Sequence, residues 1–379
     1  MAGIYIHIPY CKQACHYCNF YFSTSLKSKN DFVPALLKEM ELRQDYLGEE
    51  SVETIYFGGG TPSLISPAGL NKIIARARAL FRVDPGVEIT LEANPDDIHE
   101  GTAAAWKDAS INRLSIGIQS FFDEDLIWMN RAHHANQARE SVRKAQDAGF
   151  DNISIDLIYG GPTLPDDHWE KNLQEAVTLK VPHLSCYALT VEPGTALQKM
   201  ILLEKKADVQ QEDQARQFVL LMEWMEKAGY EHYEISNFAL PGKRSRHNAG
   251  YWQGKKYLGL GPSAHSYDGN SRQWNISNNA DYIAAINRGE LKIEKEQLTR
   301  VQTLNEYIMT SLRTVEGLHL QYVNEKFGAG IREEVERNAQ QFLAAQKMKN
   351  EGARLVLTKD GKLFADGIAA SLFFEEDES

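Results

Sequence analysis

The sequence predicts an α/β protein: a partial (β/α)6 TIM-like barrel, followed by a smaller C-terminal α+β domain of winged-helix-like shape. Short apolar runs rich in Ile, Val and Leu alternate with helix-length segments over about the first 190 residues, as βα units of a parallel sheet do. Between residues 231 and 268 the chain instead becomes rich in Gly, His and aromatic residues. After residue 300 a separate, largely helical unit begins.

Six strands with helices between them are expected in the first part of the chain. The second helix has a clear beginning, because Ser66 can cap it and Pro67 suits its first position. The expected strands span residues 4–8, 53–57, 88–92, 113–118, 152–158 and 184–189. The expected helices span residues 31–47, 66–81, 136–148, 168–179 and 208–230.

The tail is expected to contain three helices and a hairpin. The helices span residues 301–314, 320–327 and 330–349, and two strands follow around the turn Lys359-Asp360-Gly361-Lys362. The predicted organisation therefore has three regions: a barrel over residues 1–235, a flanking segment over 236–299 and a C-terminal domain over 300–379.

Composition narrows the class of protein. The chain has 379 residues, 43% of them hydrophobic and 25% charged, which is typical of globular proteins. Its formal net charge of −11 argues against a general nucleic-acid binder. No apolar run reaches the roughly 18 residues of a membrane span, and the N-terminus lacks the pattern of a signal peptide. A cytoplasmic protein is expected, with any membrane association loose and through partners.

Three of the four cysteines lie within eight residues, as Cys11-x3-Cys15-x2-Cys18, just after the first expected strand. Iron–sulfur cubanes normally take four Cys ligands, so three thiolates leave one iron with an open position. The amino and carboxylate groups of a methionine moiety can fill such a position. The motif therefore predicts a [4Fe-4S] cluster that binds S-adenosylmethionine and can pass one electron to its sulfonium.

The alternative to a cluster is a zinc site, and the fourth cysteine has a different setting. A zinc site could use His16 or His7 as a fourth ligand, but structural zinc sites usually pair two knuckles, and the sequence has no second one. Cys186 lies in an apolar run, which favours a buried small side chain in a core strand.

A glycine run extends the pattern. Gly58, Gly59 and Gly60 precede Thr61 directly after the second expected strand, where glycines allow the backbone to approach a ligand closely. Together with the cysteine triplet, this run resembles the radical S-adenosylmethionine superfamily. Over roughly residues 3–270 the sequence resembles its branch of oxygen-independent coproporphyrinogen III oxidases and their relatives. The resemblance implies that the glycine loop meets the methionine amino group.

Further residues match the superfamily strand by strand. The resemblance implies that Arg131 pairs with the methionine carboxylate and that the backbone of Tyr17 touches the adenine. Polar residues at the carboxyl ends of parallel strands are also where barrel sites form. The other residues implied at the cosubstrate are Tyr5, Glu92, Gln119 and Asp156.

One position departs from the decarboxylating oxidases. Their loop continues with a fourth Cys two residues after the third, where this chain has Phe20. This difference resembles a sister group of haem chaperones, which also carries the motif His-Asn-x-x-Tyr-Trp. Here that motif gives His247, Tyr251 and Trp252 as expected haem contacts, with His247 a candidate axial ligand and His265 its competitor.

The first functional hypothesis is thus a chaperone that carries haem as cargo to client haemoproteins, respiratory enzymes among them. The alternative is an oxygen-independent coproporphyrinogen III oxidase, which would use the same cofactors to form protoporphyrinogen IX. The resemblance leaves catalytic residues unassigned. It is compatible with a homodimer, and no nucleic-acid partner or transmembrane segment is expected.

Overall fold

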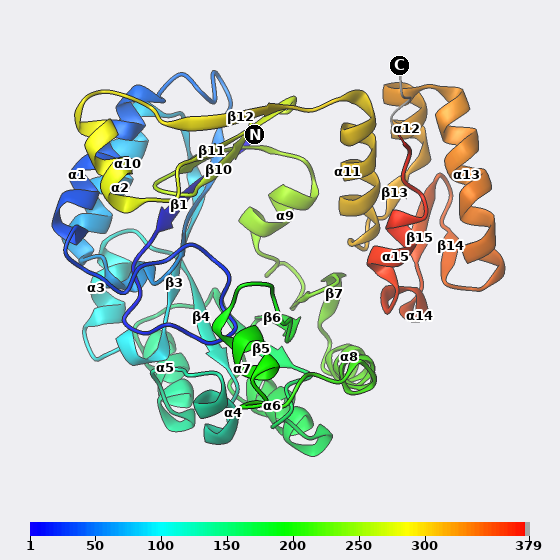
Figure 1. Cartoon of the computed structure of the whole chain (residues 1–379), viewed down its shortest axis with the longest axis horizontal. Helices are drawn as coiled ribbons and strands as arrows, with labels where there is room; N and C mark the ends of the chain where they lie inside the picture. Colours follow the sequence, from blue (N-terminus) through cyan, green and yellow to red (C-terminus); the bar gives the residue numbers. More distant parts are fainter. Residues whose placement is uncertain (376–379) are drawn as a thin grey trace.

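A twelve-stranded sheet dominates the computed structural model, which describes residues 1–375 (Figure 1). Its central six strands are parallel neighbours in sequence order, with helices crossing over between them. These strands are β1 (Ala2–Ile8), β2 (Val52–Gly59), β3 (Val83–Ala93), β4 (Arg113–Gln119), β5 (Ile153–Tyr159) and β6 (His183–Ala188). The predicted α/β class and all six predicted strands are confirmed.

Helices connect the central strands. Ser66 Oγ accepts a hydrogen bond from the Gly69 N–H at 3.2 Å, and Pro67 takes the first helical position, so the predicted start of α2 is confirmed. None of the helices within residues 1–375 is both long and apolar enough to cross a membrane. The helices of this part are α1 (Lys29–Leu42), α2 (Pro67–Leu80), α3 (Thr102–Asp108), α4 (Asp123–Trp128), α5 (Ala135–Asp147), α6 (Asp166–Thr178), α7 (Ala196–Leu202) and α8 (Gln211–Lys227).

Shorter strands extend the sheet at both ends. Strand β9 pairs in parallel with β1, and the next three strands continue outward in antiparallel fashion. At the other end β8 pairs with β6 and β7, and in the described residues the sheet stays open between β12 and β7. These elements are β7 (Glu231–Glu234), β8 (Asn237–Ala239), α9 (Arg246–Trp252), β9 (Lys256–Leu260), β10 (His265–Tyr267), β11 (Ser271–Asn275), α10 (Asn279–Asn287) and β12 (Ile293–Gln297).

A buried carboxylate joins α1 to the added strands. Glu39 accepts hydrogen bonds from the Gly261 N–H (2.8 Å), Asn275 Nδ2 (2.7 Å) and the Tyr282 hydroxyl (2.6 Å). Burial raises the pKa of Glu39, while the guanidinium of Arg43, 3.8 Å away, opposes that rise. A satisfied buried carboxylate of this kind fixes the relative position of the elements that supply its donors.

The C-terminal domain has its own apolar core and stands beside the barrel near β7 and α8 (Figure 1). Its small sheet has the order β13-β15-β14. The Arg313 carbonyl accepts from the Ile235 N–H at 3.0 Å, which ties this domain to the β7–β8 turn. Its elements are α11 (Arg300–Leu312), β13 (Leu318–His319), α12 (Leu320–Phe327), α13 (Ala329–Ala344), β14 (Met348–Asn350), β15 (Arg354–Leu357), α14 (Lys359–Lys362) and α15 (Ala365–Ala370).

The predicted hairpin turn at residues 359–362 is wrong. This segment is the short helix α14, because Thr358 Oγ1 accepts from the Gly361 N–H at 3.1 Å and caps it. The hairpin lies earlier and joins β14 to β15 around Gly352, whose φ is +67°. The predicted helix over 330–349 correspondingly ends at Ala344.

Replacement of the Glu39 carboxylate tests how strongly it holds the barrel edge. We expect Glu39→Ala to lower the free energy of unfolding by about 3 kcal/mol, because it removes the buried acceptor of the Gly261 N–H and the Tyr282 hydroxyl and the anion that faces Arg43. Urea denaturation followed by circular dichroism measures this change. Glu41→Ala, at an exposed position of the same helix, is the control and should change it by less than about 0.5 kcal/mol. Equal effects of the two variants would contradict the assigned role.

Candidate functional site

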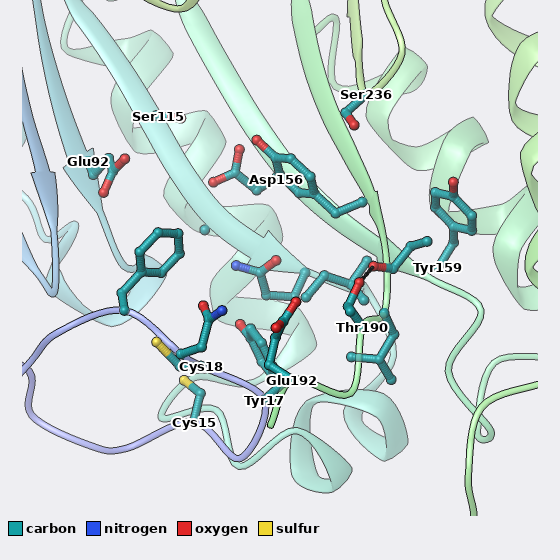
Figure 2. A pocket seen from close by; sticks show the side chains of 18 of the residues that line it. Cys15, Tyr17, Cys18, Glu92, Ser115, Asp156, Tyr159, Thr190, Glu192 and Ser236 are labelled. Carbon is teal, nitrogen blue, oxygen red and sulfur yellow. Dashed lines mark hydrogen bonds between the residues drawn. The ribbon is translucent and has the colours of Figure 1, made fainter. Parts of the chain in front are cut away.

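A cleft of about 920 Å³ opens at the carboxyl ends of the central strands and extends to the C-terminal domain. Figure 2 shows Cys15 and Cys18 on their loop, with Glu92 and Asp156 on the strands beyond it. The predicted site residues that line the cleft are Cys11, Cys15, Cys18, Tyr17, Gly59, Gly60, Thr61, Glu92, Gln119, Arg131 and Asp156. The structure thus brings together eleven residues that are spread over about 145 positions of the sequence.

The cysteine loop is fastened to the segment that follows α4. The His16 N–H donates to the Met129 carbonyl at 3.2 Å, and Asn130 Nδ2 donates to the Ala14 carbonyl at 2.7 Å. Gln13 Nε2 returns a bond to the Asn130 carbonyl at 2.9 Å. These contacts hold the loop, which lacks regular secondary structure of its own, against the mouth of the cleft.

The thiol groups have the surroundings of metal ligands. Thr61 Oγ1 lies 3.5 Å from Cys11 Sγ, and Arg131 Nη1 lies 3.2 Å from Cys15 Sγ. Burial raises the pKa of Cys11, and it raises that of Cys18 to about 11, so thiolate formation requires a cation. Among residues 1–375, no group of three His, Cys, Asp or Glu side chains is positioned to hold a metal ion.

The glycine run lies directly beneath the cysteine loop. A Cβ on Gly60 would lie 2.7 Å from the Tyr10 carbonyl oxygen and 3.0 Å from Cys11 Sγ. Gly59 has a φ of +106°, and a Cβ there would lie 2.6 Å from His7 Nδ1. Only glycine fits these two positions, and the result is bare backbone next to the thiols. Gly58 lies deeper and does not line the cleft.

Arg131 is the central cation of the site. Its Nη2 donates to Asn94 Oδ1 at 2.7 Å and to the Gly117 carbonyl at 2.8 Å. Within the described residues its buried Nε has no hydrogen-bond partner. Both hydrogens of Nη2 are thus used and Nη1 faces Cys15, so Nε is the donor of this guanidinium that is left for an amino-acid carboxylate.

Sequence reasoning missed two partners of this arginine. Asn94 donates to Thr61 Oγ1 at 3.2 Å while accepting from Arg131, and so joins the ends of β2 and β3. Gly117 is required because a Cβ there would lie 3.0 Å from Gln119 Nε2 and 3.3 Å from Arg131 Nη2. The signal for Asn94 was its place two residues after Glu92, at the carboxyl end of the same strand.

Two half-buried carboxylates face the cleft from β3 and β5, the strands on either side of β4. Burial raises the pKa of Glu92 to about 7, and the Tyr56 hydroxyl, which donates to Glu92 Oε1 at 2.7 Å, opposes the rise. Burial also raises the pKa of Asp156 to about 6, against a hydrogen bond from Ser185. These groups exchange protons near neutral pH and can accept hydrogen bonds from ligand hydroxyls.

Gln119 ends β4 with a φ of +69°, in the left-handed region. A non-glycine residue held there costs of order 1 kcal/mol and often marks a functional site. Gln119 lines the cleft, as does Tyr17 of the cysteine loop. The contact of these two residues with the cosubstrate stays a prediction.

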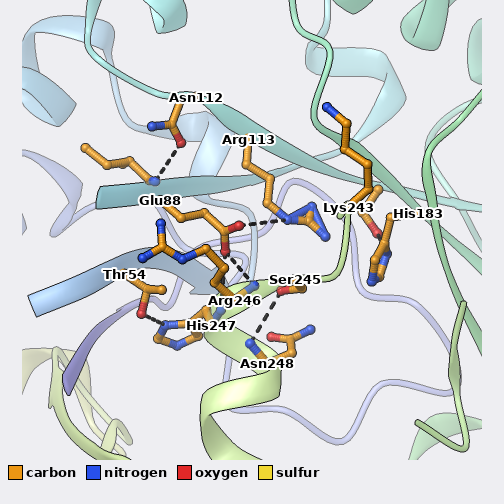
Figure 3. A network of polar contacts seen from close by, with 12 residues as sticks. Thr54, Glu88, Asn112, Arg113, His183, Lys243, Ser245, Arg246, His247 and Asn248 are labelled. Atoms are coloured by element: carbon orange, nitrogen blue, oxygen red, sulfur yellow. Dashed lines mark hydrogen bonds and ion pairs between the residues drawn. The ribbon is translucent and has the colours of Figure 1, made fainter. Parts of the chain in front are cut away.

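The His-Asn-x-x-Tyr-Trp motif lies at the opposite end of the barrel. Helix α9 packs against the amino-terminal ends of the strands, where Figure 3 shows Thr54, Glu88 and Arg113 converging on it. His247 Nδ1 is 2.7 Å from Thr54 Oγ1, and His247 Nε2 is 2.9 Å from the Tyr251 hydroxyl. Both ring nitrogens are therefore engaged within the barrel floor.

Little space surrounds this histidine. The cavity beside it has about 10 Å³, and the ring stacks on Tyr56 at 4.8 Å and on Tyr5 at 6.3 Å. Trp252 lies under the guanidinium of Arg313, at 5.3 Å. The structure does not bring Tyr5, His247, Tyr251 or Trp252 to the large cleft. Haem contact by this motif stays a prediction, and ligation by His247 would require one ring nitrogen to give up its contact with Thr54 or Tyr251.

The comparisons with known proteins agree with this architecture. A family model described as the radical SAM superfamily matches residues 5–176, and one described as the HemN C-terminal domain matches residues 298–364. The solved structure of coproporphyrinogen III oxidase HemN from Escherichia coli has a TM-score of 0.84 and 20% identity, over 98% of this chain and 90% of that one. The fold and the site thus define a radical SAM protein, a class that implies a [4Fe-4S] cluster and S-adenosylmethionine.

Curated relatives narrow the class. A protein named heme chaperone HemW from Mycobacterium tuberculosis is 34% identical over 98% of this chain and 94% of its own length. Another of that name, from Bacillus subtilis, is 32% identical over 99% of this chain and 100% of its own. The chain belongs to the HemW family of the radical SAM superfamily.

Cysteine substitution tests the metal site. We expect Cys11→Ala, Cys15→Ala and Cys18→Ala each to reduce the iron content of anaerobically reconstituted protein from roughly four to well under one per chain, because each thiolate holds a different iron. Cys186→Ala is the control: that side chain is buried in the sheet and should leave iron and acid-labile sulfide unchanged. Full iron content in a loop variant would contradict the assignment.

Proposed function

We propose that this protein is a haem chaperone, which binds haem and passes it to client haemoproteins. The observation that carries this proposal is the 34% identity, over nearly the whole length of both chains, to a protein named heme chaperone HemW. Phe20 supports it, because the decarboxylating oxidases that the sequence resembles have a cysteine at this position.

The cleft residues have distinct roles in holding the cofactors. Cys11, Cys15 and Cys18 would hold the [4Fe-4S] cluster, which supplies one-electron chemistry when bound. Arg131 would bind the methionine carboxylate, because its Nε is buried and unpaired in the described part of the chain. The backbone of the loop from Gly58 to Thr61 would bind the amino group.

The remaining cleft residues would orient the nucleoside. Glu92 and Asp156 can accept hydrogen bonds from hydroxyl groups, and Gln119 supplies a neutral amide. The backbone of Tyr17 lies on the cysteine loop, within reach of an adenine. Because Glu92 has a pKa near 7, its proton can also be exchanged with a ligand at neutral pH. Tyr5 would contribute indirectly: it stacks on Tyr56 and so helps to position that ring beside Glu92.

A second candidate function is coproporphyrinogen III oxidation, favoured by the fold shared with HemN. At 20% identity that likeness concerns the fold, and it leaves the substrate open. The proposed clients are haemoproteins, respiratory enzymes among them. We further propose a cytoplasmic location, with loose membrane contact through those clients, and a homodimer.

Ligand assays separate the two functions. We expect anaerobically reconstituted protein to bind ferric haem with a micromolar or lower Kd, because the cleft is large and partly apolar. With coproporphyrinogen III, S-adenosylmethionine and a reductant, we expect no protoporphyrinogen IX by chromatography. Catalytic turnover to that product would establish the oxidase instead, and absence of haem binding would remove the chaperone proposal.

Replacement of Arg131 tests the cosubstrate site. Arg131→Lys should weaken S-adenosylmethionine binding at least tenfold, because an ammonium cannot hold Asn94 and the Gly117 carbonyl while also donating from the position of Nε. Iron content should stay unchanged, and equilibrium dialysis measures the affinity. Arg143→Lys, at an exposed position of α5, is the matched control. Unchanged affinity in Arg131→Lys would place the carboxylate elsewhere.

A further inference from the structure

The cleft extends well beyond the part where the cysteine loop and the strand ends would hold the cofactors. Beyond the cysteine loop and the strand ends it continues between the barrel and the C-terminal domain, where β6, the β7–β8 turn and the segment from α14 to α15 form its walls. At about 920 Å³ the whole cleft is at the upper end of the range for ligand pockets. The residues that hold the cluster and S-adenosylmethionine leave this second half unassigned.

Apolar and aromatic side chains line the second half. Tyr187 of β6 and Phe364 of the C-terminal domain keep 43% and 50% of their surface exposed, although both line the cleft. Phe20, 67% exposed, lines the cleft two residues after Cys18. Tyr159 and Phe218 stack at 6.2 Å and cover the barrel side. Open aromatic rings on facing walls suit a flat, apolar ligand.

Two cations stand at the far end. Lys362 Nζ donates to the His232 carbonyl at 3.4 Å, a long contact that uses one of its three donors. Burial lowers the pKa of Lys362 to about 8, so an anion beside it would restore full protonation. Arg313 pairs with Glu234 at 3.1 Å and with the mostly exposed Asp366 at 2.7 Å, and an exposed pair of this kind is readily exchanged for another anion.

The cations near the His-Asn-x-x-Tyr-Trp motif are less suited to a ligand. The cavity beside His247 has about 10 Å³, and none of these cations lines the large cleft. Each also pairs with a group on the protein, as Arg313 does. Partnered in this way are Lys243 with Asp151, Arg244 with Glu231 and Glu316, Arg246 with the Gly86 carbonyl, Lys255 with Glu53 and Lys256 with Glu50.

We propose that haem binds in the half of the cleft between the barrel and the C-terminal domain, with its propionates on Lys362 and Arg313 and its porphyrin face against Tyr187 and Phe364. This site rests on the proposed haem-chaperone function and assigns the cargo to a place that the barrel alone does not form. The distribution of charge matches the ligand, because haem carries its two carboxylates on one edge of an apolar disc.

Paired titrations of the reconstituted full chain test the site, with ferric haem and its dimethyl ester as probes. Lys362→Gln should weaken haem binding roughly tenfold and leave binding of the ester, which lacks free carboxylates, unchanged. Phe364→Ala should weaken both probes, because it removes an apolar contact. Lys359→Gln changes the neighbouring lysine of α14, which faces Glu226 at 3.5 Å outside the cleft, and is the matched control.

The possible results distinguish a failure of the proposed function from a failure of the proposed haem site. If the parent binds neither probe, the proposed function fails and the site with it. If the parent binds haem but Lys362→Gln and Phe364→Ala stay within about twofold of it, the function stands and this site is wrong. If His247→Gln alone abolishes binding while its iron content and melting temperature equal those of the parent, haem binds at α9 instead. Equal affinity of the parent for haem and ester would overturn the propionate contacts.

Discussion

The buried guanidinium of Arg131 is the contact on which the site depends. It holds the ends of β3 and β4 together through Asn94 and the Gly117 carbonyl, and it reaches Cys15 on the cysteine loop. A cation in this position lowers the cost of thiolates and of a ligand carboxylate at once. Burial also removes much of the hydration of this guanidinium. The hydrogen bonds to the surrounding acceptors are needed to compensate for that loss. One side chain therefore couples the geometry of the metal loop to that of the strands.

The two ends of the barrel have separate tasks. At the carboxyl ends of the strands, the site combines exposed glycine backbone, thiols and carboxylates of raised pKa. It offers hydrogen-bond donors and acceptors that a ligand can use. At the amino ends, His247 closes the floor with both ring nitrogens engaged. The two layers touch through Tyr56, which stacks on His247 and donates to Glu92. A substitution of His247 can therefore affect the cofactor site through the ring of Tyr56. The motif can in this way influence the cofactor site without contacting a ligand itself.

Much of the fold followed from local pattern. Apolar strands at βα spacing gave all six central strands, and the Ser66–Pro67 cap gave the start of α2. That Glu92, Gln119 and Asp156 share one cleft was predictable because the carboxyl ends of parallel strands meet, whereas their roles at the cosubstrate are what the family resemblance implies. The turn predicted at Gly361 failed because a capping hydroxyl on Thr358 favours helix, a contact that hairpin rules do not weigh. Asn94 and Lys362 were missed for another reason: their importance comes from partners far away in sequence, and no local pattern reports such partners.

The C-terminal domain changes what the cleft can bind. A barrel that ended at β7 would leave the apolar surface of Tyr187 open to solvent, since the facing wall comes from residues near Phe364. The main-chain bonds from the Ile235 N–H to the Arg313 carbonyl and from the Val315 N–H to the Tyr233 carbonyl fix that wall to the barrel. The ion pair of Arg313 with the exposed Asp366 lies within the C-terminal domain. The rigid contacts thus lie in the backbone and the exchangeable ones in side chains. This arrangement lets a carboxylate ligand replace Asp366 without separating the two domains, which suits a protein that must both hold its cargo and release it.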